Sequence, residues 1–199
     1  MFFFGVAAVI FGLTLVVSLF GLSRREVIDA MLLRPYWLTR NGEYHRLITS
    51  GLVHADGGHL FFNLFTFFFF AFPLERVLGP WGFLALYLIG LVLSDLGTWF
   101  KHRNDPDYAS LGASGAILAV LFAYIVYFPE STLMLFPLPI PIPAPLFAVL
   151  YLAYSWWSSR QNRGRINHDA HIGGALTGMA FVAVTDPGAY RRLFEILGV

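Results

Sequence analysis

The chain has 199 residues, of which 57% are hydrophobic and only 13% are charged, whereas an ordinary soluble domain carries about 25% charged residues. This composition excludes a typical soluble domain and indicates an integral membrane protein, and we expect residues 1–199 to form a single domain. The net charge of +1 gives no sign of a nucleic-acid partner, and the lack of cysteine excludes disulfides, thiolate metal sites and a cysteine nucleophile.

Apolar stretches of about 20 residues can cross about 30 Å of hydrocarbon as helices. The sequence predicts six such spans, of which the fifth is the shortest: Phe3–Leu22, His59–Leu78, Trp81–Phe100, Leu111–Phe128, Ala144–Ser158 and His168–Thr185. Trp residues lie at the ends of the third and fifth spans, as expected at a membrane interface. The N-terminus lacks the basic region of a signal peptide, so we expect the first span to be retained. The predicted class is an all-α polytopic membrane protein.

Two connecting segments are unusual. The segment Ser23–Gly58 mixes Arg with apolar residues at helical spacing, which favours an interfacial amphipathic element over an exposed loop. In Phe136–Pro145 every second residue is proline, which blocks an α-helix, so we expect an extended or polyproline-like conformation. A stiff connector at the membrane and a proline-rich ligand for another domain are both compatible with this stretch.

Polar side chains are costly inside a membrane and are therefore candidates for function. His59 and Asn63 have the spacing i, i+4, so both lie on one face of the second span. Their side chains could donate hydrogen bonds to a developing oxyanion. Alternatively, the pair could simply hold helices together.

Ser114 lies in Gly112-Ala113-Ser114-Gly115, near the start of the fourth span. A serine at this position is often only a helix cap. However, the small flanking residues allow another helix or a substrate to approach, and the free N–H groups of a helix start favour negative charge. Ser114 is therefore a candidate nucleophile.

The sixth span carries His171 and a small-residue face formed by Gly174 and Gly178. A matching face on the fourth span is formed by Gly115 and Ala119. If the two faces pack, His171 lies about one turn from Ser114 and can take its proton.

Other ionisable residues near this histidine are candidates for the same site. His168 is a rival base, three residues away on the same span. Asp169 should point elsewhere on the helix, and Asp95 is the other candidate acid inside a span, so we favour a Ser–His dyad without an acid. The chain has six histidines but no H-E-x-x-H motif, so we expect no catalytic metal and no cofactor.

Three motifs together make nearly the whole chain resemble the rhomboid family of intramembrane serine proteases. They are His59-x-x-x-Asn63, Gly112-x-Ser114-Gly115 and Ala170-His171-x-x-Gly174-x-x-x-Gly178, in this order. The resemblance implies a six-transmembrane-helix rhomboid-like bundle with a long interfacial first loop. It also implies that the substrates are other membrane proteins, cut in or near a transmembrane helix in the lipid bilayer.

The resemblance implies a role for each matched residue. Ser114 would be the nucleophile and His171 the general base and then the general acid. His59, Asn63 and the main-chain N–H of Ser114 would form the oxyanion hole, and Gly174 and Gly178 would allow close helix packing.

The sequence departs from the family pattern at two places. The first loop reads His45-Arg46 where the family often has Trp-Arg. Leu118 stands where many members have a tyrosine packed under the catalytic histidine. The second departure puts the ring support of His171 in doubt.

Two arguments about the orientation of the chain in the membrane contradict each other. Most Lys and Arg residues lie on the side of the long first loop, which the positive-inside rule would place in the cytoplasm. The resemblance places that loop and the mouth of the site on the non-cytoplasmic face of the plasma membrane, and we follow it because interfacial Arg can bind lipid head groups on either face.

Two rival functions remain. The first is a catalytically silent rhomboid-like protein that binds transmembrane helices, and the second is a small transporter. The oligomeric state is left open.

Overall fold

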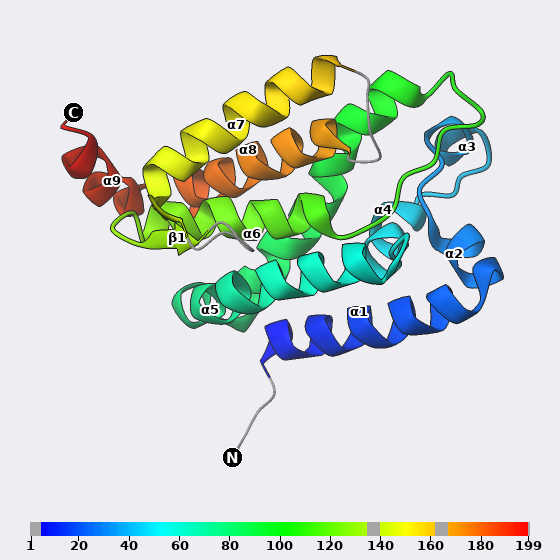
Figure 1. Cartoon of the computed structure of the whole chain (residues 1–199), viewed down its shortest axis with the longest axis horizontal. Coiled ribbons are helices and arrows are strands. Elements are labelled where there is room, and N and C mark those ends of the chain that lie inside the picture. Colours follow the sequence, from blue (N-terminus) through cyan, green and yellow to red (C-terminus); the bar gives the residue numbers. More distant parts are fainter. Residues whose placement is uncertain (1–4, 135–139, 162–166, 199) are drawn as a thin grey trace.

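The computed structural model of the chain describes residues 5–134, 140–161 and 167–198, and most of these residues are helical (Figure 1). The elements in chain order are α1 (Val6–Ser23), α2 (Arg25–Met31), α3 (Pro35–Arg40), α4 (Arg46–Thr49), the 3-10 helix η1 (Ser50–Leu52), α5 (Gly57–His102), α6 (Ser114–Tyr127), β1 (Thr132–Met134), β2 (Pro141–Pro143), α7 (Ala144–Arg160), α8 (His168–Thr185), the 3-10 helix η2 (Pro187–Ala189) and α9 (Tyr190–Leu197).

The long element α5 consists of two helical segments that meet at Gly79. This glycine has φ 70° and ψ 168°, a conformation that interrupts the helix, and Pro80 follows it. A positive φ is strained for residues other than glycine, and a proline is well suited to start the second segment. The predicted second and third spans, His59–Leu78 and Trp81–Phe100, lie within these two segments.

The other predicted spans also correspond to helices. The predicted span His168–Thr185 coincides with α8, and α7 begins at the predicted Ala144. Within the described residues, α1 and α5 are long and apolar enough to cross a membrane, whereas α6 is apolar but has only 14 residues. The number of membrane crossings therefore stays a prediction.

Helix α6 lies at the centre of the molecule, between α5 and α8 (Figure 1). Almost every residue from Gly115 to Val126 is buried. Small side chains allow this close packing: a Cβ atom at Gly90 of α5 would lie 2.9 Å from the Cβ atom of Ala119. Helix α6 is thereby packed closely against its neighbours over most of its length.

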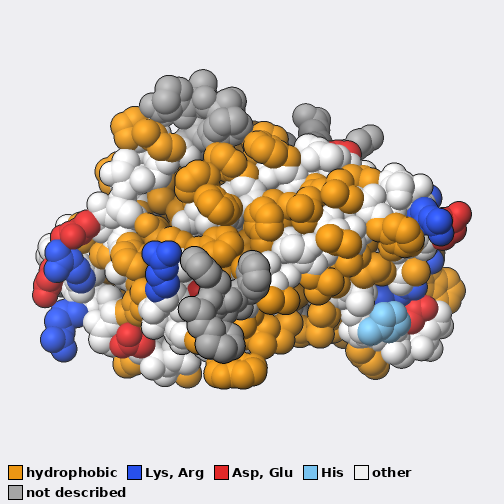
Figure 2. Space-filling view, turned by 90° about the horizontal axis from the view of Figure 1, so that it is seen from below, with side chains coloured by type: hydrophobic (Ala, Val, Ile, Leu, Met, Phe, Trp, Pro, Cys, Tyr) orange, Lys and Arg blue, Asp and Glu red, His pale blue; other side chains and the backbone are white. Residues whose placement is uncertain are grey.

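The surface around this core is strongly apolar. Large hydrophobic side chains such as Val16, Trp81 and Val184 are 66%, 78% and 83% exposed. Figure 2 shows that hydrophobic side chains cover the middle of one face, while charged side chains gather mainly towards its two ends. An exposed apolar surface of this kind marks a site of interaction with a membrane or with another protein.

The segment between α1 and α5 folds into α2, α3, α4 and η1 around the buried Arg46. Its guanidinium donates hydrogen bonds to the carbonyl oxygens of Asp29 (3.1 Å) and Leu32 (2.9 Å), and it pairs with Glu43 at 2.7 Å. The prediction of helical structure in Ser23–Gly58 is therefore confirmed. Its position in the membrane interface stays a prediction.

The proline-rich stretch departs from the expectation in two ways. Residues 136–139 lie outside the described residues, but Pro141–Pro143 forms a strand that pairs antiparallel with β1, so the chain is not purely helical. The extended conformation was expected to continue to Pro145, and this is wrong because α7 begins at Ala144. A proline in the first helical turn loses no hydrogen bond, since the N–H groups there have no partner within the helix.

Candidate active site

Ser114 is the first residue of α6, directly after a turn of unusual conformation. Gly112 has φ 109°, which a residue with a side chain rarely adopts. Its N–H donates a 2.9 Å hydrogen bond to the carbonyl of Ser50 in η1. The first loop is thus tied to the segment that presents Ser114 at a helix start, where main-chain N–H groups have no partner within the helix.

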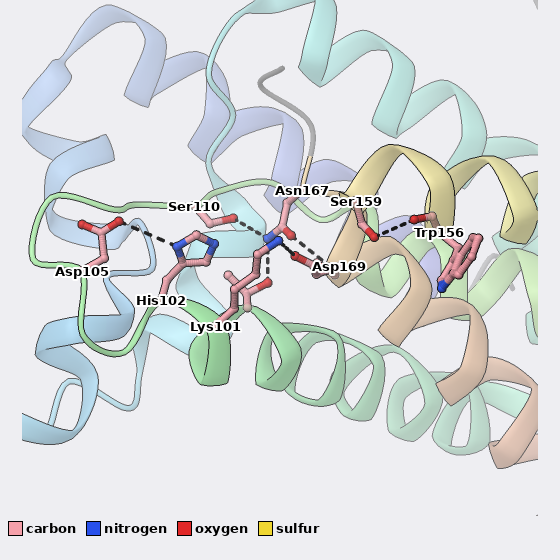
Figure 3. A network of polar contacts seen from close by, with 10 residues as sticks. Lys101, His102, Asp105, Ser110, Trp156, Ser159, Asn167 and Asp169 are labelled. Carbon is pink, nitrogen blue, oxygen red and sulfur yellow. Dashed lines mark hydrogen bonds and ion pairs between the residues drawn. The ribbon is translucent and has the colours of Figure 1, made fainter. Parts of the chain in front are cut away.

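His171 lies in the first turn of α8, which is capped by Asn167. The side-chain oxygen of Asn167 accepts a hydrogen bond from the N–H of Ala170 (3.1 Å). Its Nδ2 atom donates to Thr98 Oγ1 (2.7 Å) and Ser110 Oγ (3.2 Å). Figure 3 shows how Asn167 points towards Ser110. This one side chain fixes the start of α8 against α5 and the segment that leads into α6.

Glycines allow α8 to touch α6 at the level of the main chain. A Cβ atom on Gly174 would overlap the carbonyl oxygen of Gly115, and one on Gly178 would overlap the carbonyl oxygen of Ala119. The two small-residue faces identified in the sequence therefore pack against each other. Because the contact is so close, the first turns of both helices are adjacent.

This packing brings Ser114 and His171 into direct contact. The Oγ atom of Ser114 lies 2.9 Å from Nε2 of His171. His168 is directed elsewhere, since its Nε2 atom lies 2.9 Å from Ser158 Oγ on α7. Of the two candidate bases, the structure brings His171 and not His168 to the serine. A pair at this distance can transfer a proton from the hydroxyl to the imidazole.

Asp169 is not part of this contact. Its carboxylate forms a 2.8 Å ion pair with Lys101 at the end of α5, which Figure 3 shows. A surface hollow of about 560 Å³ lies beside this pair, between α5 and α8. The expectation that Asp169 points away from the two histidines is therefore confirmed.

His59 lies next to the turn that precedes Ser114, and Asn63 lies one helical turn further along α5. The imidazole of His59 packs on Gly112, because a Cβ atom there would meet His59 Cε1 at 2.6 Å. Asn63 is buried and its Nδ2 atom donates a 2.9 Å hydrogen bond to the carbonyl of His59. This bond leaves the second N–H of the Asn63 amide, and a neutral His59 ring has one further N–H to donate.

His54 supports this group from the first loop. Its ring lies edge-on to His59 with centroids 4.8 Å apart, and its Nδ1 atom lies 2.8 Å from Ser18 Oγ on α1. Burial lowers the pKa of His54 to about 3, so the ring is neutral at physiological pH. These contacts link α1, through His54 and His59, to the turn that precedes α6.

Tyr151 of α7 is the residue that sequence reasoning missed. Its hydroxyl lies 2.9 Å from Nδ1 of His171, and the two rings are nearly parallel, with centroids 6.3 Å apart. Leu118 cannot supply this ring contact, so support comes from another helix. The signal in the sequence was weak: Tyr151, Ser155 and Ser158 lie on one face of an apolar helix.

Within the described residues, no group of three or more His, Asp or Glu side chains is arranged to hold a metal ion.

Comparison with known proteins places the chain in a family. The Rhomboid domain matches residues 41–187. YdcA of Bacillus subtilis, named as a candidate rhomboid protease, is 43% identical over 86 residues, which cover 43% of this chain and 42% of YdcA. RHOMBOID-like protein 12 of Arabidopsis thaliana, a mitochondrial protein, is 30% identical over 168 residues, covering 76% of this chain and 49% of the relative.

The rhomboid protease GluP of Bacillus subtilis is 27% identical over 175 residues, covering 86% of this chain and 32% of GluP. The chain thus spans about half or less of the length of these relatives. The match to the Rhomboid domain includes Arg46 of the first loop. It also includes Ser114 and His171 at the starts of α6 and α8, and the glycines at which these helices touch. The chain therefore belongs to the rhomboid family, whose members are embedded in membranes.

Proposed function

We propose that this chain is an intramembrane serine endopeptidase that cleaves transmembrane segments of other membrane proteins. The observation that carries the proposal is the 2.9 Å contact between Ser114 Oγ and His171 Nε2, made by the first turns of two helices in main-chain contact. A serine that merely capped α6 would need no imidazole at this distance. Membership of a family that includes proteases gives independent support.

The proposed reaction begins at Ser114. His171 Nε2 accepts the hydroxyl proton while Oγ forms a bond to the scissile carbonyl carbon, and the carbonyl π electrons move onto its oxygen. The imidazolium then gives the proton to the leaving amide nitrogen as the C–N bond breaks. Water attacks the resulting acyl-enzyme by the same route, with His171 again as base, and restores the serine. No metal or cofactor takes part in this scheme.

The negative charge on the tetrahedral intermediate needs hydrogen-bond donors. The free N–H of Ser114 at the helix start, His59 and the second N–H of Asn63 are the donors we assign to this oxyanion hole. Donors held in place before the reaction need no reorganisation as charge develops, which is usually a large part of catalysis. The packing of His59 on Gly112 and the bond from Asn63 to the His59 carbonyl would keep them in place.

The proposal includes a membrane context. We count six crossings by treating the two segments of α5 as separate spans together with α1, α6, α7 and α8. The mouth of the site would lie beside the first loop, on the non-cytoplasmic face of the plasma membrane. Both dyad residues lie in the first turns of their helices, so water would reach them from that end without crossing the bilayer.

The decisive experiment is cleavage of transmembrane substrates by the purified protein in detergent. Wild type should cleave, whereas Ser114→Ala and His171→Ala should each lose activity to background. His168→Gln separates the two candidate bases, because it should leave cleavage within a few-fold of wild type. A fluorophosphonate probe should label wild type and not Ser114→Ala.

A folded wild-type protein that cleaves none of several substrates and takes up no probe would overturn this proposal. Binding of transmembrane helices without cleavage would then be the better description of the protein. Loss of activity in His168→Gln with retention in His171→Ala would instead move the role of base to His168.

A further inference from the structure

The second ring nitrogen of His171 is also engaged, by a residue on a third helix. The hydroxyl of Tyr151 on α7 lies 2.9 Å from Nδ1, while Ser114 lies 2.9 Å from Nε2. The imidazole is therefore held at both nitrogens, with the tyrosine ring nearly parallel to it. In serine hydrolases with a full triad, the position at Nδ1 belongs to a carboxylate.

The direction of these hydrogen bonds follows from proton counting. A neutral imidazole carries one proton, and Nε2 must be unprotonated to accept the proton of Ser114. Nδ1–H must therefore donate to the phenol oxygen of Tyr151. The phenol proton needs an acceptor of its own. Ser155 lies one turn further along α7, is fully buried, and its Oγ atom has no hydrogen-bond partner among the described residues, so it is available as that acceptor.

The acid next to the dyad in the sequence is not available for this position. Asp169 is paired with Lys101 at 2.8 Å on the other side of α8. His168, the neighbouring imidazole, is engaged by Ser158. Helix α7 thus supplies a hydroxyl partner to each histidine, and the partner of the reactive one is Tyr151.

We propose that Tyr151 is a positioning residue of the dyad. Its phenol oxygen accepts the hydrogen bond from His171 Nδ1–H and so keeps the ring in the tautomer, and in the orientation, that presents a lone pair to Ser114. This inference rests on the proposed function. Tyr151 replaces the acid of a triad in its orienting role but brings no negative charge.

Because Tyr151 brings no charge, we expect loss of its hydroxyl to have a moderate effect on kcat. A neutral hydrogen bond typically contributes about 0.5–1.5 kcal/mol, which converts to about 2- to 13-fold in rate, whereas disabling the triad aspartate in a serine protease costs about 10⁴-fold. Tyr151→Phe keeps the ring and removes the hydroxyl. We expect it to lower kcat about tenfold and to leave KM within about twofold, because the lost interaction touches the base and not the substrate. Tyr154→Phe is the matched control, because it removes a tyrosine hydroxyl from a more exposed position of α7.

A spectroscopic readout tests the tautomer without relying on activity. Nitrogen NMR of histidine-labelled protein in detergent distinguishes Nδ1–H from Nε2–H rings, and the signals of His171 are assigned by comparison with His171→Gln. We expect the Nδ1–H form in wild type and in Tyr154→Phe. In Tyr151→Phe we expect a mixture of tautomers.

Failure of the positioning role and failure of the proposed function give different results. An Nε2–H ring at His171 in unmutated protein would overturn the inference whether or not any variant folds. Retention of wild-type kcat and an unchanged His171 spectrum in Tyr151→Phe would overturn it as well. A wild-type protein that shows the Tyr151-dependent tautomer and cleaves nothing would contradict the proposed function while leaving the positioning role intact.

Discussion

Gly174 on α8 lies so close to the main-chain carbonyl of Gly115 on α6 that a Cβ atom at position 174 would overlap its oxygen. Ser114 directly precedes Gly115 in the chain, and His171 lies three residues before Gly174. The distance between Ser114 and His171 is therefore controlled by a contact that only glycine permits.

Gly174→Ala should separate the two helices. A methyl group forced against a carbonyl requires main-chain shifts, and overpacking of this kind typically costs about 1–3 kcal/mol. We expect a loss of stability of this size, measured by unfolding in mixed micelles, together with at least a tenfold loss of cleavage. Gly12→Ala in α1 is the control, since a Cβ atom there has open space around it and alanine is the better helix former. Equal stability and activity of Gly174→Ala and wild type would contradict the close contact.

Glu75 of α5 caps the start of α1. Its two carboxylate oxygens accept hydrogen bonds from the N–H groups of Val6 (2.6 Å) and Ala7 (3.1 Å). A carboxylate at a helix N-terminus gains from both the free N–H groups and the helix dipole. We expect Glu75→Ala to lower the free energy of unfolding by about 1–2 kcal/mol and Glu75→Gln, which keeps one acceptor, by less.

The control for this pair of variants is Glu195→Gln on the exposed face of α9, which should leave stability within about 0.5 kcal/mol. The cap would be excluded as a stabilising contact if Glu75→Ala unfolded at the same denaturant concentration as wild type.

Much of the helical framework follows from the sequence because its signals are local. The sixth span was predicted to begin at His168, where α8 does begin, and the structure adds that the side chain of Asn167 caps this helix. The Gly79-Pro80 pair explains why an apolar stretch of 46 residues contains two helical segments. Small residues spaced by four predicted which faces of α6 and α8 would meet, and the glycine contacts match that face.

The remainder depends on tertiary contacts that leave little trace in the sequence. Tyr151 and His171 are 20 residues apart and on different helices, and a tyrosine in an apolar helix resembles an ordinary interface residue. The short helices α3 and α4, of six and four residues, are too short for a periodic pattern and form around the buried Arg46. The hairpin of β1 and β2 has only three residues per strand and two prolines, so alternation could not reveal it.

Replacement of Asp169 tests the prediction that the dyad works without an acid. Its ion pair with Lys101 is 2.8 Å long but partly exposed, with 39% of the Lys101 and 29% of the Asp169 side chain accessible. Such pairs contribute about 0–1 kcal/mol. We therefore expect Asp169→Asn and Lys101→Met to change stability by less than about 1 kcal/mol and to keep kcat within about threefold. A loss of 100-fold or more in Asp169→Asn alone would identify Asp169 as a functional acid.

His54 should make the stability of the protein depend on pH. Burial lowers its pKa to about 3 in the folded state, whereas a histidine in the unfolded chain has a pKa of about 6.5. Between these values the unfolded state binds the proton and the folded state does not, so this contribution is complete above about pH 6.5 and declines as the pH falls. Between about pH 7 and pH 4.5 the loss would be at most about 3 kcal/mol.

The measurement is the free energy of unfolding in detergent at several pH values in that window. His54→Gln should be less stable than wild type at pH 7 because it disturbs the contact with Ser18, yet its stability should fall less between pH 7 and pH 4.5. His45→Gln is the control, since it replaces an exposed histidine of the same loop. Because the three proteins carry the same carboxylates, the difference between the slopes reports on the replacement of His54. Parallel slopes for wild type and His54→Gln would show that its ring does not resist protonation in the folded state.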